Sequence, residues 1–344
     1  MNVLRWIAVA AVSVTALLGG CAKQEAGKKL FVYNWTYYIP DQVLKDFEAK
    51  FGVKLVYDVY ASNEEMFAKL KAGGTGYDLV FPSGDYVSIM IKEGMVDSID
   101  KSKVPNFAHL DTSALNKIRF DAGCTHSVPY MMGCAGVCVN KKLVKEYDRS
   151  WSIFARPDLK GRMTMLDDMR EVMGAALKTL GCSVNTTNPE ELAKAKQIVL
   201  TWRDNITKFD AESFGKGFAA GEFWAVQGYA ENIFLELDST MKPDADFFIP
   251  KEGGSMYMDN ICILKGAKNK DLAYAFINYM HEPEVYAKIV DFLMLPSINV
   301  EARAFRKVKP NYELSDLATC EFKEDLGPAL ELYNKIWQEI RVGK

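Results

Sequence analysis

The stretch LFVYNWTYYIPDQVLKDF, residues 30–47, decides the fold class of this chain. Its first four residues, 30–33, form a continuous apolar run, as expected for a strand that is buried on both faces. After Pro40, apolar side chains recur at helical spacing from Val43 to Phe51. The stretch therefore predicts a strand-to-helix corner of an open α/β sheet. Ligands bind at such corners, outside the carboxyl ends of the strands.

Aromatic side chains crowd this corner. Trp35, Tyr37 and Tyr38 follow the predicted strand, with Thr36 between the first two. Rings in such a place can line a slot for an apolar or a cationic ligand. The same rings can instead cap the hydrophobic core beneath the loop, and the stretch alone leaves both interpretations open.

The composition bounds the classes of protein to consider. A chain of 344 residues with 49% hydrophobic side chains can fill the cores of two domains. The formal net charge is −3 and the sequence has no basic tract, which argues against nucleic acid as a partner. The isolated histidines His109, His126 and His281 offer no metal-ligand spacing. We expect no bound metal and no cofactor.

The amino terminus has the pattern of an export signal. Arg5 precedes an apolar run, residues 6–18, which is too short to be a comfortable membrane span. The sequence LGGC at 18–21 resembles a bacterial lipobox, in which the cysteine becomes the lipidated first residue. Ordinary cleavage with Cys21 unmodified is the alternative. We expect a signal peptide at 1–20, lipidation of Cys21 and a tether over 21–29, which would hold the protein to a membrane.

Six cysteines remain after the signal: Cys124, Cys134, Cys138, Cys182, Cys262 and Cys320. An even count in an exported chain is compatible with disulfides. However, Cys134 and Cys138 lie four residues apart in a predicted strand, about 13 Å at the usual rise, which is too far to bridge. A large domain protein also does not need such cross-links. We expect mostly buried free thiols.

Strand and helix patterns alternate along the chain, which predicts an α/β protein. The run at 128–140 is long, apolar and interrupted by glycines, as a strand that crosses between domains would be. The Gly-rich stretch 251–259 is expected to lead into a strand at 260–264. Two separate series of strands imply two sheets. The other main predicted strands are 54–60, 77–81 and 162–166.

No catalytic motif is found. The sequence has no nucleophile elbow, Walker loop, dinucleotide fingerprint or zinc spacing. A carboxylate or an aromatic ring instead recurs at the predicted strand ends: Trp35, Tyr38, Asp85, Asp168, Glu171, Tyr229, Tyr257 and Asp259.

Each of these residues has a purely structural alternative. Asp168 and Glu171 have the spacing of a helix capping box. Asp85 can complement the positive end of the helix that follows it, and Asp259 can be a turn aspartate in its Gly-rich stretch. The two later tyrosines can belong to the core.

Six segments carry a resemblance to a known family: YNWTYYIP (33–40), YDLVFPSGDYV (77–87), NKI…VPYMMG (116–133), LDDMREV (166–172), PKEGGSMYMD (250–259) and KNKDLAYAFIN (268–278). In order and spacing the chain resembles the bacterial periplasmic spermidine/putrescine-binding proteins, the receptors of polyamine ABC importers, from about Leu30 to its end. The resemblance implies a two-domain, Venus-flytrap periplasmic-binding-protein fold of type II, with the ligand cleft between the domains. The implied domains are 27–136 with 259–303, and 137–258 with 304–344.

The resemblance also implies roles for residues at the cleft. Trp35 and Tyr38 would sandwich the methylene chain of the ligand, and Asp259 falls on a main ammonium-binding carboxylate. The other implied ligand contacts are the hydroxyls of Thr36 and Ser83, the acids Asp168 and Glu171, and Tyr229 and Tyr257, which stand where the family commonly has tryptophans.

Four positions depart from the family pattern. Tyr37 stands where one spermidine binder has an acid, and Asp85 adds an acid to the predicted site where that binder has a tyrosine. Leu295 replaces an aromatic residue that would flank the ligand. Lys323 replaces a neutral amide, and a cation near a cationic ligand repels it.

These observations predict an extracytoplasmic lipoprotein that captures putrescine or spermidine and delivers it to an ABC permease. We expect it to act as a monomer and to have no enzymatic activity. A receptor for another small solute, such as iron held by tyrosines, is the alternative within this class, although no His-Tyr-Tyr cluster can be assembled from the sequence. An exported enzyme and an adhesin that binds no small molecule are the alternatives from other classes.

We predict that Cys21 anchors the protein through a lipid. The change Cys21→Ser removes the thiol that would carry the lipid, so the variant should move from the detergent phase to the aqueous phase in detergent phase partitioning. Wild type should stay in the detergent phase. A variant that partitions like wild type would show that Cys21 carries no anchor.

Overall fold

The computed structural model describes residues 28–74 and 76–342. The predicted signal peptide 1–20, Cys21 and all but the last two residues of the predicted tether lie outside the described residues. Within the described ranges, no helix is long and apolar enough to cross a membrane.

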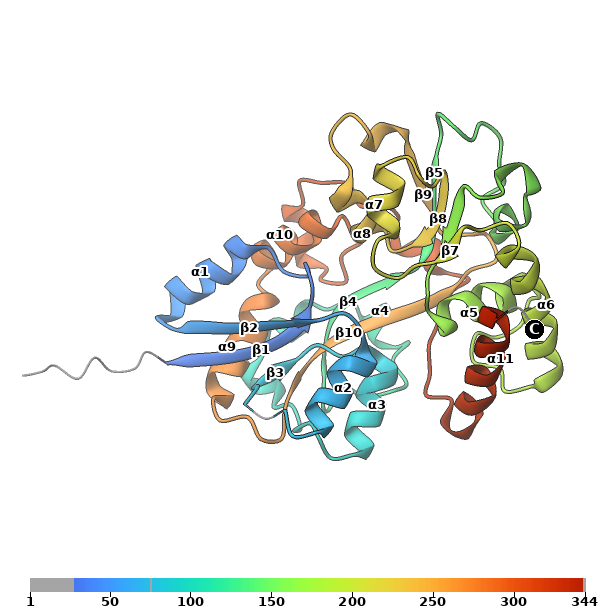
Figure 1. The fold of residues 1–344 in the computed structure, drawn as a ribbon. Helices are drawn as coiled ribbons and strands as arrows, with labels where there is room; N and C mark the ends of the chain where they lie inside the picture. The colour runs from blue at the N-terminus through green and yellow to red at the C-terminus, as the bar shows by residue number, and fades with distance from the viewer. Residues whose placement is uncertain (1–27, 75, 343–344) are drawn as a thin grey trace, which may run out of the picture.

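The first sheet is built mainly from the N-terminal part of the chain (Figure 1). Its strands run in the order β11-β10-β3-β1-β2, and β4 pairs with β10. The strands are β1 (Lys29–Trp35), β2 (Lys54–Tyr60), β3 (Leu79–Val80), β4 (Val128–Cys134), β10 (Ser255–Ile263) and β11 (Glu321–Phe322). The α-helices between and after them are α1 (Asp41–Phe51), α2 (Asn63–Lys71), α3 (Gly84–Lys92), α4 (Thr112–Leu115), α9 (Lys270–Met280) and α10 (Pro283–Leu293).

The second sheet is formed by the middle of the chain, in the order β7-β6-β8-β5-β9. Its strands are β5 (Gly136–Asn140), β6 (Met163–Met165), β7 (Lys208–Phe209), β8 (Ala225–Gly228) and β9 (Ala245–Phe248). The helices of this part are α5 (Met169–Thr179), α6 (Pro189–Arg203), α7 (Phe214–Ala219), α8 (Ala230–Glu236) and α11 (Leu330–Val342). In Figure 1, α5, α6 and α11 lie together on one side of this sheet, which confirms the predicted α/β architecture with two sheets.

The opening corner forms as the sequence predicts. β1 has Leu30, Val32 and Tyr33 fully buried, and it is parallel to both of its neighbours. Pro40 then precedes the first residue of α1. Gly52 ends that helix with φ 62°, in the left-handed region that glycine adopts without strain. The polypeptide therefore leaves the sheet at Trp35 and returns to it at β2.

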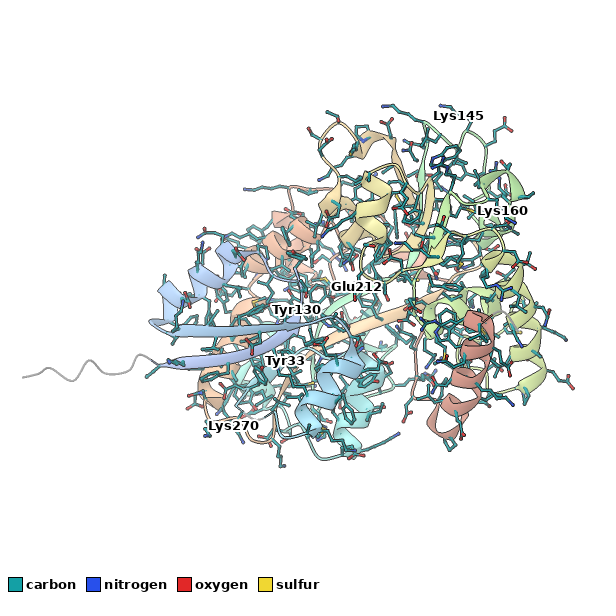
Figure 2. The ribbon with its side chains drawn as sticks, in the orientation of Figure 1. Tyr33, Tyr130, Lys145, Lys160, Glu212 and Lys270 are labelled. Atoms are coloured by element: carbon teal, nitrogen blue, oxygen red, sulfur yellow. The ribbon has the colours of Figure 1, made fainter. Side chains whose placement is uncertain are left out.

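Side chains sort by chemistry between core and surface. Tyr33 and Tyr130 have no exposed area, whereas Lys145, Lys160 and Lys270 are exposed (Figure 2). The six cysteines of the described residues are free thiols, as predicted, and five of them are buried: Cys124, Cys134, Cys138, Cys262 and Cys320.

The apolar run at 128–140 connects the two sheets, but the prediction of one continuous strand is wrong. The structure divides the run at Ala135 into β4 and β5, because β4 pairs with β10 whereas β5 pairs with β8 and β9. Glycines allow close approach on both sides of the break. A Cβ atom at Gly133 would lie 2.3 Å from the Tyr257 hydroxyl, and one at Gly136 would lie 2.4 Å from a backbone carbonyl.

β10 is longer than the sequence predicts. It begins at Ser255, so Tyr257 and Asp259 lie on a buried strand and the interpretation of Asp259 as a turn aspartate is wrong. Pairing with β4 extends the strand, with a register shift between Asp259 and Asn260. The predicted domain border at 258/259 falls inside β10, and β11, from the predicted second domain, pairs with it. The proposed domain limits therefore remain a prediction.

Candidate functional site

A pocket of about 590 Å³ is lined by residues that follow β1 and β3 of the first sheet, and by residues at the start of α5 and the end of β8. Nine of the ten predicted ligand-binding residues line it: Trp35, Thr36, Tyr38, Ser83, Asp85, Asp168, Tyr229, Tyr257 and Asp259. The tenth, Glu171, lies behind Lys323, which does line the pocket. The structure thus brings the predicted residues of both sheets to one cavity.

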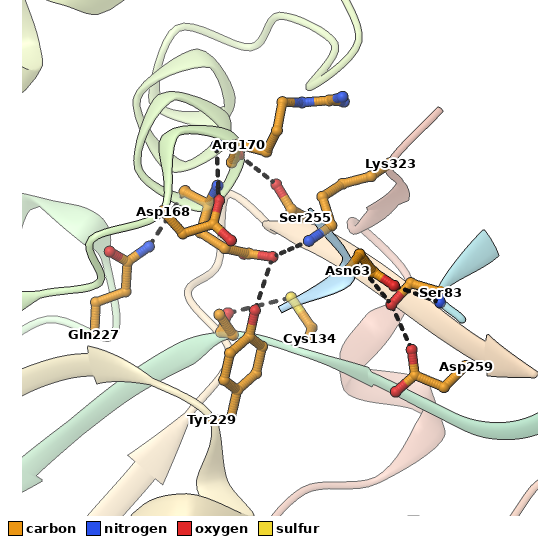
Figure 3. Close-up of polar contacts among 12 residues, drawn as sticks. Asn63, Ser83, Cys134, Asp168, Arg170, Gln227, Tyr229, Ser255, Asp259 and Lys323 are labelled. Carbon is orange, nitrogen blue, oxygen red and sulfur yellow. Dashed lines mark hydrogen bonds and ion pairs between the residues drawn. The ribbon is translucent and has the colours of Figure 1, made fainter. Parts of the chain in front are cut away.

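Asp259 is held by hydroxyl groups. Its Oδ1 accepts a hydrogen bond of 2.6 Å from Ser83 Oγ, and its Oδ2 accepts one of 2.6 Å from the Tyr38 hydroxyl. Figure 3 shows the contact with Ser83, whose hydroxyl also accepts from Asn63 at 3.1 Å. Burial raises the pKa of Asp259 to about 6, although both hydroxyl donors act in the opposite direction. The carboxyl group is oriented, but among the described residues it has no ion-pair partner.

Glu171 does have a cationic partner. Its Oε1 lies 2.7 Å from Lys323 Nζ and accepts a hydrogen bond of 3.2 Å from the Tyr229 hydroxyl. Figure 3 shows Lys323 reaching toward this point from one side and Tyr229 from the other. Burial raises the pKa of Glu171, against the opposing effect of the Lys323 charge. Burial would lower the pKa of Lys323, but the charges of Glu171, Asp168 and Asp85 raise it overall, so the lysine is a cation.

Asp168 and Asp85 both lie at the start of a helix, which is the position that a purely structural role for them requires. Asp168 Oδ1 accepts from the backbone N–H groups of Arg170, at 2.8 Å, and Glu171, at 3.1 Å. The side chain of Glu171 binds Lys323 and Tyr229 instead of completing a capping box. Asp85 lies in the first turn of α3, and its buried Oδ1 has no hydrogen-bond partner among the described residues. Both aspartates also face the pocket, so capping does not account for their whole environment.

The aromatic residues divide into fixed rings and an exposed one. Trp35 Nε1 donates to the Phe81 carbonyl at 2.8 Å, and the rings of Tyr229 and Tyr257 meet edge to face at 5.7 Å. Tyr37 is 71% exposed, with φ 58°. These contacts hold the pocket rings in place before any ligand enters.

Leu295 does not face the pocket. Its side chain is completely buried in the main hydrophobic cluster, so the expectation that it flanks a ligand is wrong. The reason is local: the backbone turns at Met294, which has φ 52°, and Leu295 N–H bonds back to the Val290 carbonyl. Of the two departures expected to lie along the slot, only Lys323 does so.

Glu231 is a pocket residue that the sequence analysis missed. It lies in the first turn of α8, is only 8% exposed, and accepts a hydrogen bond of 3.0 Å from the Tyr257 hydroxyl. Burial raises its pKa to about 7, and the charge of Asp259 acts in the same direction. The available signal was an acid two residues after Tyr229, at the start of a short helix after a predicted strand end.

The pocket and the fold define a class of protein. The family model described as bacterial extracellular solute-binding protein matches residues 42–313, and the chain belongs to this family. Buried carboxylates, fixed rings and a cavity between two sheets suit the capture of a small cationic solute. The fold is the type II periplasmic-binding-protein fold, as expected, and the protein is extracytoplasmic.

Individual proteins of known name are similar to this chain over most of its length. The chain is 34% identical to the spermidine/putrescine-binding periplasmic protein of Escherichia coli (strain K12), over 97% of each sequence. It is 33% identical to the putrescine/cadaverine-binding protein of Pseudomonas aeruginosa, over 96% of this chain and 98% of the relative. The crystal structure of the TpPotD lipoprotein of Treponema pallidum is similar, with a TM-score of 0.89, 49% identity, and coverage of 92% of this chain and 100% of that one. The relatives are named as solute-binding proteins.

The raised pKa values predict how stability depends on pH without ligand. Folded Glu231, with a pKa of about 7 against an ordinary 4.5, keeps a proton that the unfolded chain releases. The free energy of unfolding should therefore fall by roughly 3 kcal/mol as pH rises through this window. Asp259, with a pKa of about 6 against 3.8, acts in the same sense at lower pH. Chemical unfolding between pH 5 and pH 8 measures the slope.

A comparison with Asp259→Asn isolates the contribution of the pocket. His281 opposes the predicted slope, because burial lowers its pKa, and this residue is unchanged in the variant. The stability of Asp259→Asn should fall less between pH 5 and pH 8 than that of wild type. Equal slopes in the two proteins would contradict the assignment of a raised pKa to Asp259.

Proposed function

We propose that this protein is a receptor that captures a polyamine, putrescine or spermidine, outside the cytoplasm and delivers it to an ABC permease. The observation that carries the proposal is that both parts of the chain contribute carboxylates to a pocket lined with aromatic rings. Asp259 lies on β10 of the first sheet, and Asp168 is the N-cap residue of α5 beside the second. The names of the relatives, which include spermidine, putrescine and cadaverine, point to the same ligand class.

The chemistry of a polyamine fits such a pocket. The ligand is an apolar chain with a positive charge at each amine, so it needs rings along its length and carboxylates at intervals. A ring facing a cation contributes about 0.5–2 kcal/mol, whereas removing one partner of a buried ion pair costs about 3–5 kcal/mol. The carboxylates therefore select the ligand, and the rings adjust its affinity.

Supply of acids by both sheets favours closure around the ligand. An ammonium group drawn to Asp259 and another drawn toward Asp168 would pull the two parts of the chain together. We propose that the moving units are 27–136 with 259–303, and 137–258 with 304–344. The protein would act as a monomer that is held to the membrane by lipid on Cys21.

Isothermal titration calorimetry of residues 22–344 tests this function. Putrescine or spermidine should bind, and control amino acids should not, because their carboxylate would enter an acidic pocket. Asp259→Asn should weaken binding by about 100-fold or more, and Tyr229→Phe by much less, since the ring stays. Absence of polyamine binding by wild type would refute the proposal.

The Lys323–Glu171 pair predicts a preference for short ligands. Lys323 is paired with Glu171, a carboxylate that could otherwise bind a further amine of the ligand. Putrescine should therefore bind at least as tightly as spermidine. Lys323→Gln frees Glu171 and should improve spermidine binding more than putrescine binding, by about tenfold in the ratio of affinities.

Lys178→Gln is the matched control for that change. Lys178 is also a largely buried lysine in an ion pair, with Glu321 at 2.8 Å, but it does not line the pocket. Its replacement should leave the ratio of the two affinities unchanged. If Lys323→Gln also leaves the ratio unchanged, Lys323 does not select ligand length.

A further inference from the structure

The charges around the pocket are unevenly balanced. Among the described lining residues, the cationic side chains are Lys323 and Arg170. The guanidinium of Arg170 donates to the Glu324 carbonyl and to Asn185. Only Lys323 therefore offers a positive charge to the buried carboxylates, and it is paired with Glu171.

Glu231 is left without a counter-charge. It makes no ion pair with any described residue; its side chain accepts a hydrogen bond from the Tyr257 hydroxyl, and its own backbone N–H also stabilises the ionised form. Asp259 is in a similar position, because its two donors, Ser83 and Tyr38, are neutral hydroxyls. An uncompensated carboxylate at 8% or 5% exposure is costly, so such groups are normally paired in a finished site.

We propose that Glu231 contacts the ligand directly and, with Asp259, forms a subsite for a primary ammonium group in the pocket. The inference rests on the proposed function and adds to it one acid and one constraint on the ligand. A primary ammonium carries three N–H donors, enough to bridge both carboxylates. A fully methylated amine carries the charge but no donor, so this subsite selects primary amines.

Ligand binding at this subsite also depends on pH. The groups that face Glu231 and Asp259 are phenols, a hydroxyl and other pocket charges: Tyr38, Ser83, Asp85, Tyr229, Tyr257, Tyr312 and Lys323. With pKa values of about 7 and about 6, Glu231 is mostly protonated below about pH 7 and Asp259 below about pH 6. An incoming ammonium must displace these protons, so affinity rises as pH increases from 6 to 8.

Calorimetry of putrescine binding to Glu231→Gln tests the inference. At pH 8 the variant should bind at least about tenfold more weakly than wild type, and its affinity should change less between pH 6 and pH 8. Glu236→Gln is the matched control, because it removes the same charge from an exposed position on the same helix. This control should bind like wild type.

A thermal melt without ligand distinguishes ligand binding from a structural role. Glu231→Gln keeps the shape and removes an uncompensated buried charge, so its melting temperature at pH 8 should equal or exceed that of wild type. A lower melting temperature together with an unchanged pH profile of binding would assign Glu231 a structural role and overturn the inference. Wild-type affinity for putrescine in Glu231→Gln would also overturn it.

A second variant covers the case in which Glu231→Gln does not fold. Tyr257→Phe removes the hydroxyl that stabilises ionised Glu231, so the midpoint of the pH dependence of binding should move to higher pH. An unmoved midpoint overturns the inference.

Methylated ligands test the requirement for a primary amine. N,N,N′,N′-tetramethylputrescine and hexamethylated putrescine, which lack primary amines, should bind far more weakly than putrescine. If wild type binds no polyamine, the proposed function fails as well, whereas wild-type binding with an unaffected Glu231→Gln refutes the inference alone.

Discussion

The backbone pairing of β10 is the constraint on which the pocket depends. All nine residues of this strand are buried, so its N–H and C=O groups must find partners within the protein. They do so with β3 and β4 in antiparallel pairing and with β11 in parallel pairing. Because Tyr257 and Asp259 are fixed to this strand, the position of the acid is set by the sheet and not by a mobile loop.

The neighbours of β10 are shaped to leave room for its side chains. The absence of a side chain at Gly133 gives the Tyr257 ring its place, since a Cβ there would meet the ring hydroxyl. The Asp259 carboxyl group accepts hydrogen bonds from Ser83 and Tyr38, which follow the carboxyl ends of β3 and β1. The packing that forms the sheet therefore also positions the side chains of the site.

Local features could be predicted from the sequence, whereas the pairing of distant strands could not. The first corner and β2 were predictable because apolar runs, Pro40 and Gly52 act within a few residues. The extension of β10 to Ser255 and the break at Ala135 depend on strand partners that are distant in the sequence, which no local pattern reveals. Resemblance located most of the pocket, but it could not find Glu231, because a single acid in a short helix has no distinctive spacing.

Lys323 can be regarded as a tethered competitor for one of the binding groups. An amine attached to the same chain faces Glu171 at an effective concentration in the millimolar range or above, without any loss of translational freedom. A dissolved ligand at far lower concentration displaces it only by making better contacts elsewhere. Glu171 then contributes little to the affinity for the first amine that enters. Without ligand, Lys323 also neutralises the charge of this carboxylate, so no inorganic cation is needed there.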